Sequence, residues 1–135
     1  MIRTARIIVL INPPISPVYN QNPGFRVLDV DGSEVRDQTT YYLTNLTAAK
    51  AGHGSWKKEY TFSREWQTKR LDPASLGKLY TEITGDETAR AHWLKLYNVS
   101  SSAAKVKPEE VRGLYCTIEG LGVGAYRNCA CAAAP

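Results

Sequence analysis

The chain has 135 residues, of which 43% are hydrophobic and 22% charged, and its formal net charge is +4. This length suits one domain, and the composition is that of a globular chain rather than a disordered one. The Lys and Arg residues are scattered rather than concentrated in a stripe, and no apolar run reaches the roughly 20 residues that span a bilayer. We therefore expect neither nucleic-acid binding nor a transmembrane segment.

The first third of the chain predicts β-strands. Residues 6–12 contain an apolar run at 7–11, which is too short for a signal peptide and predicts a buried strand that Pro13 and Pro14 end. A proline-rich loop follows over residues 12–24. Residues 25–31 and 35–43 predict two further strands, joined by the pair Asp31 and Gly32 that is typical of tight hairpin turns.

The remainder of the chain changes from polar connections to helices. Residues 44–55 predict a polar connection, and residues 56–66 fit either a helix or a strand. Asp72 and Asp86 are in position to cap two consecutive helices, and Pro108 begins a third that ends at Gly120. Strands that precede helices in this way predict the α+β class.

Several aromatic side chains are predicted to lie in the core. They are Trp56, Trp66, Tyr80, Trp93 and Tyr97.

The sequence holds few candidates for catalysis. The two histidines, His53 and His92, have no acidic residue at metal-ligand spacing, and we interpret both as structural or surface residues. The chain has no Asp-x-His, Gly-Asn-His or Gly-His-x-His sequence of the kind that holds paired metal ions. Composition does not exclude a Ser/His/Asp triad, but nothing resembles a nucleophile elbow. The alternating glycines at 120, 122 and 124 predict a turn.

The cysteines indicate an oxidising compartment. Cys116, Cys129 and Cys131 lack zinc-type spacing, so one disulfide with one free thiol is the simplest interpretation, and it favours secretion. Asn45 and Asn98 begin glycosylation sequons, which apply only in a eukaryotic host.

Five segments of the sequence, in this order along the chain, carry a resemblance to a known family. An apolar strand at 7–11 leads into a Pro- and Ser-containing loop and then Asn-Pro-Gly-Phe-Arg-Val at 22–27. Residues 37–47 contain an Asp-x-x-Thr-Tyr-x-Leu segment before Asn-Leu-Thr. The other segments are Trp56 with Glu59 and Tyr60, the helix from residue 74 to 83, and residues 114–118 followed by Tyr126 and Cys129. Together they resemble the end of the acid-sphingomyelinase-like phosphodiesterases, a secreted branch of the calcineurin-like metallophosphoesterases.

The resemblance implies a division of the chain and an incomplete catalytic apparatus. Residues 1–46 would end the metallophosphoesterase β-sandwich, and residues 47–135 would form a C-terminal helical subdomain. The family's metal motifs lie upstream of its apolar strand, so this chain is expected to carry no cofactor and to be inactive alone. The full-length family implies zinc, a partner in the missing N-terminal catalytic portion, and a phosphodiester or phospholipid-type substrate.

The resemblance also implies roles for individual residues. The proline-rich loop would lie near the metal centre, which makes Ser16, Tyr19 and Asn20 candidates for lining the substrate side; ordinary loop hydrogen bonding is the alternative. The family's terminal disulfide corresponds to Cys116 and Cys129, although Cys131 can replace Cys129. A stand-alone secreted binding module without catalysis is the alternative function.

Overall fold

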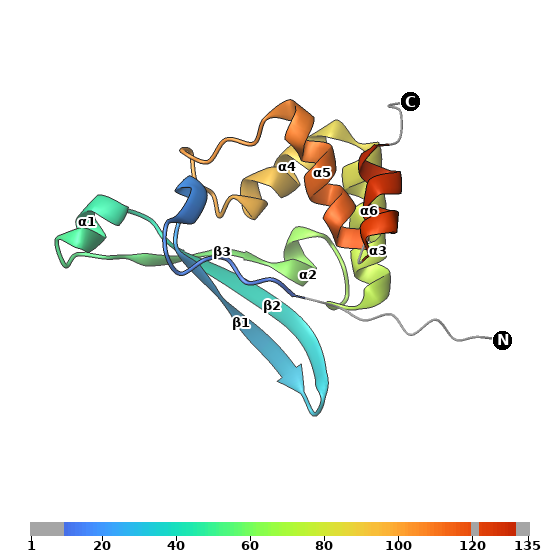
Figure 1. Ribbon diagram of the computed structural model, residues 1–135. Helices are drawn as coiled ribbons and strands as arrows, with labels where there is room; N and C mark the ends of the chain where they lie inside the picture. The colour runs from blue at the N-terminus through green and yellow to red at the C-terminus, as the bar shows by residue number, and fades with distance from the viewer. Residues whose placement is uncertain (1–9, 120–121, 132–135) are drawn as a thin grey trace.

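A computed structural model describes residues 10–119 and 122–131 of the chain. The strands come first and the longer helices follow, which confirms the predicted α+β class. Figure 1 shows the longer helices gathered on one side, with the hairpin of the first two strands projecting away from them. In chain order the elements are η1 (Val18–Asn20), β1 (Gly24–Asp31), β2 (Glu34–Leu43), α1 (Leu46–Lys50), β3 (Trp56–Thr61), α2 (Phe62–Glu65), α3 (Pro73–Gly85), α4 (Glu87–Tyr97), α5 (Pro108–Glu119) and α6 (Val123–Ala130).

The strands form one antiparallel sheet in the order β1-β2-β3. The predicted hairpin is confirmed, with Asp31 paired to Glu34 across a turn in which Gly32 adopts a φ of 59°. Glycine accepts this left-handed conformation without the steric cost that a Cβ atom brings. The ambiguous segment 56–66 contains both structures, because β3 runs directly into α2.

The structure describes only part of the segment in which a strand was predicted, residues 6–12. Residues 6–9 lie outside the described residues, and residues 10–12 are not in a strand. Leu10 nevertheless packs against the hydrophobic core.

The helix starts follow local capping chemistry. Asp72 Oδ1 accepts a hydrogen bond from Ser75 N at 2.8 Å, and Asp86 Oδ1 accepts one from Ala89 N at 2.6 Å, so both predicted caps are confirmed. Two helices were not predicted. Helix α1 lies in the expected polar connection and is capped by Asn45, and α6 begins where a turn was expected.

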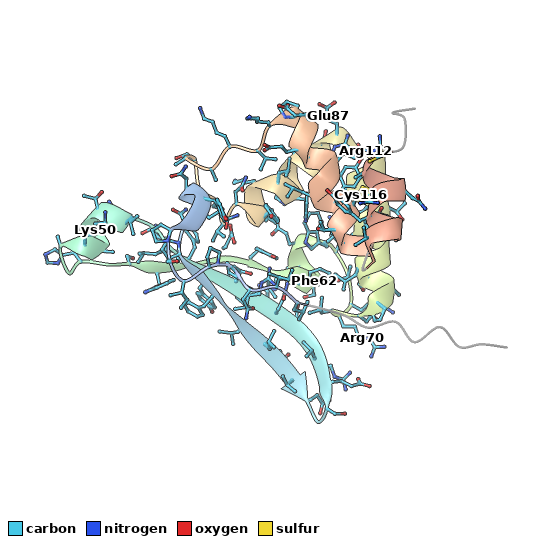
Figure 2. All side chains as sticks on the ribbon, in the orientation of Figure 1. Lys50, Phe62, Arg70, Glu87, Arg112 and Cys116 are labelled. Atoms are coloured by element: carbon cyan, nitrogen blue, oxygen red, sulfur yellow. A yellow bond between two sulfur atoms is a disulfide. The ribbon has the colours of Figure 1, made fainter. Side chains whose placement is uncertain are left out.

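The hydrophobic core lies where α2 meets the sheet and the longer helices. Phe62, Trp66 and Leu71 are 2%, 9% and 3% exposed. Figure 2 shows Phe62 between the sheet and the helices. The partly buried side chains that pack against this cluster are Leu10, Val35, Tyr60, Leu76, Leu79, Trp93 and Leu96.

The structure corrects part of the predicted aromatic core. Trp66 and Trp93 belong to the core as predicted, and Tyr80 is half-buried. The prediction was wrong for Trp56 and Tyr97, which are 47% and 43% exposed. Trp56 instead contacts Phe25 on β1, with ring centroids 5.1 Å apart. Tyr97 is the last residue of α4.

A disulfide joins the last two helices. Cys116 of α5 is fully buried and is bonded to Cys129 of α6, with the two Cα atoms 5.6 Å apart. Cys131 is free and exposed. The disulfide therefore fastens α6, a short helix that contains Gly124 and has little intrinsic stability, to α5.

Replacing both bonded cysteines, Cys116→Ser with Cys129→Ser, should lower the free energy of unfolding by about 3 kcal/mol, because the unfolded chain regains the entropy of an open loop. Urea denaturation followed by circular dichroism measures this loss. Cys131→Ser is the control and should unfold as the wild type does. Equal midpoints for the double variant and the control would contradict the prediction.

Candidate functional site

The proline-rich loop before β1 follows a fixed path. Gly24 N donates to Pro14 O at 2.8 Å, and Leu43 N donates to Pro23 O at 2.9 Å. A Cβ atom at Gly24 would lie 3.0 Å from the Pro13 side chain and 3.1 Å from Tyr41 O, so glycine permits this close approach. The loop is thus held against the end of the sheet at both its beginning and its end.

Side-chain hydrogen bonds tie this loop to the segment that follows α4. Asn22 Nδ2 donates to Val99 O at 2.9 Å, and Gln21 Nε2 donates to Tyr97 O at 3.3 Å. In the opposite direction, Ser101 Oγ donates to Asn20 O at 2.6 Å. Figure 1 shows η1 beside the connection between α4 and α5. We call residues 19–22 and 97–101, together with these bonds, the junction.

Both sides of the junction adopt left-handed backbone conformations. Tyr19 and Asn20 have φ values of 54° and 62°, and Val99 and Ser100 have values of 54° and 49°. This conformation is unfavourable for a β-branched residue such as Val99, which is only 2% exposed. Strain of this kind persists only where surrounding contacts enforce it, and it concentrates at functional sites.

A buried carboxyl group lies beneath the junction. Glu59 Oε1 accepts a hydrogen bond from Ser100 Oγ at 2.7 Å. Burial raises the pKa of Glu59 from 4.5 to about 7, although the Ser100 hydrogen bond and the charges of Arg26 and Lys95 act in the opposite direction. Glu59 therefore changes charge near neutral pH.

An open groove of about 700 Å³ lies beside the junction. Its walls come from η1, the end of α4, α5 and α6, and they include the rings of Tyr19, Tyr97 and Tyr126 with the polar side chains of Lys105 and Thr117. Arg112 also lines the groove and donates from Nε to Cys129 O at 2.9 Å. Aromatic rings and hydrogen-bonding groups around one hollow are typical of a surface that binds a polar organic molecule.

The structure separates the three residues predicted to line the substrate side. Tyr19 is 88% exposed and lines the groove. The carbonyl of Asn20 is used by Ser101, and Ser16 is exposed earlier in the loop, away from the groove lining. Their role stays a prediction. The sequence offered no pattern for Asn22, Ser100 and Ser101, because their partners lie far away in the chain.

The two sequon residues occupy different surroundings. Asn45 is exposed and caps α1 by accepting from Ala48 N at 2.9 Å. Asn98 is half-buried at the end of α4 and lines the groove. Glycosylation of either residue stays a prediction.

The residues present do not fit a metal centre. His53 is exposed in the connection after α1, and His92 Nε2 is hydrogen-bonded to Glu65 Oε1. Among residues 10–119 and 122–131, no three His, Cys, Asp or Glu side chains converge as metal ligands do. Residues 1–9, 120, 121 and 132–135 contain none of these four residue types in sequence. Within the same described ranges, no helix is long and apolar enough to cross a bilayer.

Removing the hydroxyl that closes the junction, by Ser101→Ala, should lower the free energy of unfolding by about 1 kcal/mol, because Asn20 O loses its donor. Urea denaturation measures the loss. Ser102→Ala provides the matched control, since this neighbouring side chain is exposed and outside the junction. Indistinguishable stabilities for the two variants would show that the junction bond does not contribute.

Comparison with known proteins finds relatives over most of the chain. The chain is 26% identical over 131 residues to the "Cyclic GMP-AMP phosphodiesterase SMPDL3A" of Bos taurus. The aligned region covers 90% of this chain and 29% of that protein. The proteins of the same name from Rattus norvegicus and Homo sapiens are each 26% identical over 133 residues, with the same coverage. The chain thus spans 29% of the length of these curated relatives.

The family described as "Acid sphingomyelin phosphodiesterase C-terminal region" matches residues 5–134. This match covers both the sheet and the helices, including the junction and the disulfide. The resemblance seen in the sequence is therefore confirmed, and the chain belongs to the family of acid sphingomyelin phosphodiesterase C-terminal regions.

Proposed function

We propose that the chain is the C-terminal part of a secreted, sphingomyelin phosphodiesterase-like hydrolase and that it is inactive alone. The observation that carries the proposal is a family match over residues 5–134 in a chain whose described residues bring no metal-ligand cluster together. A hydrolytic site with two metal ions needs several converging carboxylate and imidazole ligands. Those ligands, and the zinc that the family implies, would belong to a catalytic portion outside this chain.

Within such an enzyme, the loop 12–23 would form part of the substrate mouth. The junction supports this role because it holds an exposed loop against the turn after α4, while backbone hydrogen bonds hold the same loop against the sheet. Tyr19 and the adjacent groove would contact the part of the substrate that flanks the scissile phosphate. The relatives are named for hydrolysis of a cyclic dinucleotide, so a phosphodiester is the substrate class we propose.

The projecting hairpin would pack against the catalytic portion. Val27, Leu28 and Val30 of β1 are 51%, 44% and 54% exposed, and β1 lies at the edge of the sheet. Neighbouring apolar side chains on an edge strand usually mark a surface that other polypeptide covers. The length of the relatives, of which this chain spans 29%, provides such a polypeptide.

Secretion is proposed from the covalent chemistry of the chain. A disulfide between Cys116 and Cys129 persists in oxidising compartments and is rare in the cytosol. The sequons at Asn45 and Asn98 agree with this placement in a eukaryotic host.

A stand-alone secreted binding module is the second candidate, and the groove beside Tyr19 favours it. The two candidates differ at the hairpin. A module that acts alone needs no partner for β1, whereas a C-terminal part leaves an apolar interface uncovered when it is isolated.

The purified chain with added zinc should hydrolyse bis(p-nitrophenyl) phosphate no faster than buffer, because it lacks a converging ligand set. Release of nitrophenolate is the measurement, and the bovine relative serves as the active control. Metal-dependent turnover that survives repurification of the chain would overturn the proposal of inactivity.

Val27→Lys should lower the binding of a hydrophobic fluorescent dye to the isolated chain about twofold, because it places a charge in the uncovered interface. Val123→Lys is the matched control, since Val123 is 69% exposed on α6, away from the hairpin. If the wild type binds no dye, or the two variants lose it equally, the stand-alone module is favoured.

A further inference from the structure

Glu59 is a half-buried residue with a buried carboxyl oxygen, and the proposed function leaves it without a role. Thr40 pairs with Tyr60, and the next residue, Tyr41, pairs with Lys58, so Glu59 is the extra residue of a β-bulge. A bulge bends its strand and redirects a side chain. Here the redirected carboxyl group meets the turn after α4 rather than solvent.

The two carboxyl oxygens of Glu59 have unequal surroundings. Oε1 accepts from Ser100 Oγ at 2.7 Å, whereas Oε2 is buried without a hydrogen-bond partner in the described part of the chain. A neutral carboxylic acid tolerates this position better than a carboxylate, because a buried charge with an unpaired oxygen loses its hydration.

Charged groups from three other elements act on this carboxyl group. Arg26 of β1 and Lys95 of α4 favour the ionised form, and Glu65 of α2 opposes it. The Arg26 guanidinium is engaged elsewhere, since NH1 donates to Ile11 O at 2.6 Å. Burial outweighs the attraction of the two cations and raises the pKa of Glu59 to about 7.

Ser100 connects this carboxyl group to the strained junction. Ser100 and Val99 are both left-handed, and the Val99 carbonyl holds Asn22 of the loop. Ionisation strengthens the hydrogen bond from Ser100 but leaves Oε2 charged, buried and without a partner. The carboxylate gains hydration when the strained turn at residues 97–101 relaxes and carries the loop with it.

We propose that Glu59 is a proton-operated latch: the neutral acid holds the turn at residues 97–101 closed on the loop at residues 19–22, and the carboxylate releases it. Glu59 binds its proton more tightly in the closed state than in the open state. Protonation therefore stabilises the closed state fully below pH 4.5, and this stabilisation is lost as the pH rises through about 7. The latch would regulate access to the substrate side, a consequence that rests on the proposed function, whereas the latch itself does not.

Hydrogen exchange of single amides, read by NMR and corrected for intrinsic rates, tests the latch on the whole chain. The amides of Val99 and Ser100, which donate to Leu96 O and Lys95 O, should lose protection about tenfold between pH 5 and pH 8. The amide of Asp86, which donates to Glu82 O between α3 and α4, is the internal reference and should change little.

Glu59→Gln should keep the protection of Val99 and Ser100 equal at the two pH values, because the amide imitates the neutral acid. Glu34→Gln is the matched control and should retain the wild-type pH dependence, since Glu34 is exposed at the start of β2 and is not among the groups that act on Glu59. A wild type without pH dependence, or a Glu59→Gln variant that keeps it, would overturn the proposal.

A direct titration of the Glu59 carboxyl carbon in the wild type decides the question if Glu59→Gln fails to fold. A midpoint near the ordinary 4.5 overturns the latch. A midpoint near 7 supports it when the protection of the Val99 and Ser100 amides falls over the same pH range. Neither measurement uses metal or substrate, so a failure of the latch is distinct from a failure of the proposed hydrolase role.

Discussion

The junction between the proline-rich loop and the turn after α4 is the constraint on which the candidate site depends. Asn22 and Val99 are 77 positions apart in the chain, yet the Asn22 side chain bonds the Val99 carbonyl at 2.9 Å. Ser101 and Gln21 add bonds in both directions across the same contact. Without these bonds the loop would have only its attachments to the sheet, and the left-handed turns on both sides would relax.

Features whose causes are local were predictable from the sequence. The pair Asp31 and Gly32 selects a tight turn, and this turn fixes the register of the hairpin. Asp72 and Asp86 satisfy free amides at the starts of α3 and α4, which is why both helices begin where the sequence indicated. The resemblance of scattered motifs was enough to identify the family, because their order was retained along nearly the whole chain.

Features that depend on distant partners were not predictable. Trp56 has a large apolar side chain of the kind usually found in a core. Its strand lies at the edge of the sheet, so the side chain packs against Phe25 and stays about half exposed. The bulge at Glu59 arises where the register between β2 and β3 shifts by one residue, and this pairing depends on both strands. Helix α6 was missed because the glycines at 120, 122 and 124 indicated a turn, whereas the disulfide to α5 holds the helix.

Under the proposed function, these features shape a site whose chemistry another part of the enzyme performs. The chain presents a fixed loop and a groove, and its described residues gather no metal-ligand cluster. Equilibrium dialysis of the purified chain against zinc tests this claim most directly. The account predicts no stoichiometric zinc at micromolar concentration, and one or two tightly held ions lost on substitution of His53 or His92 would contradict it.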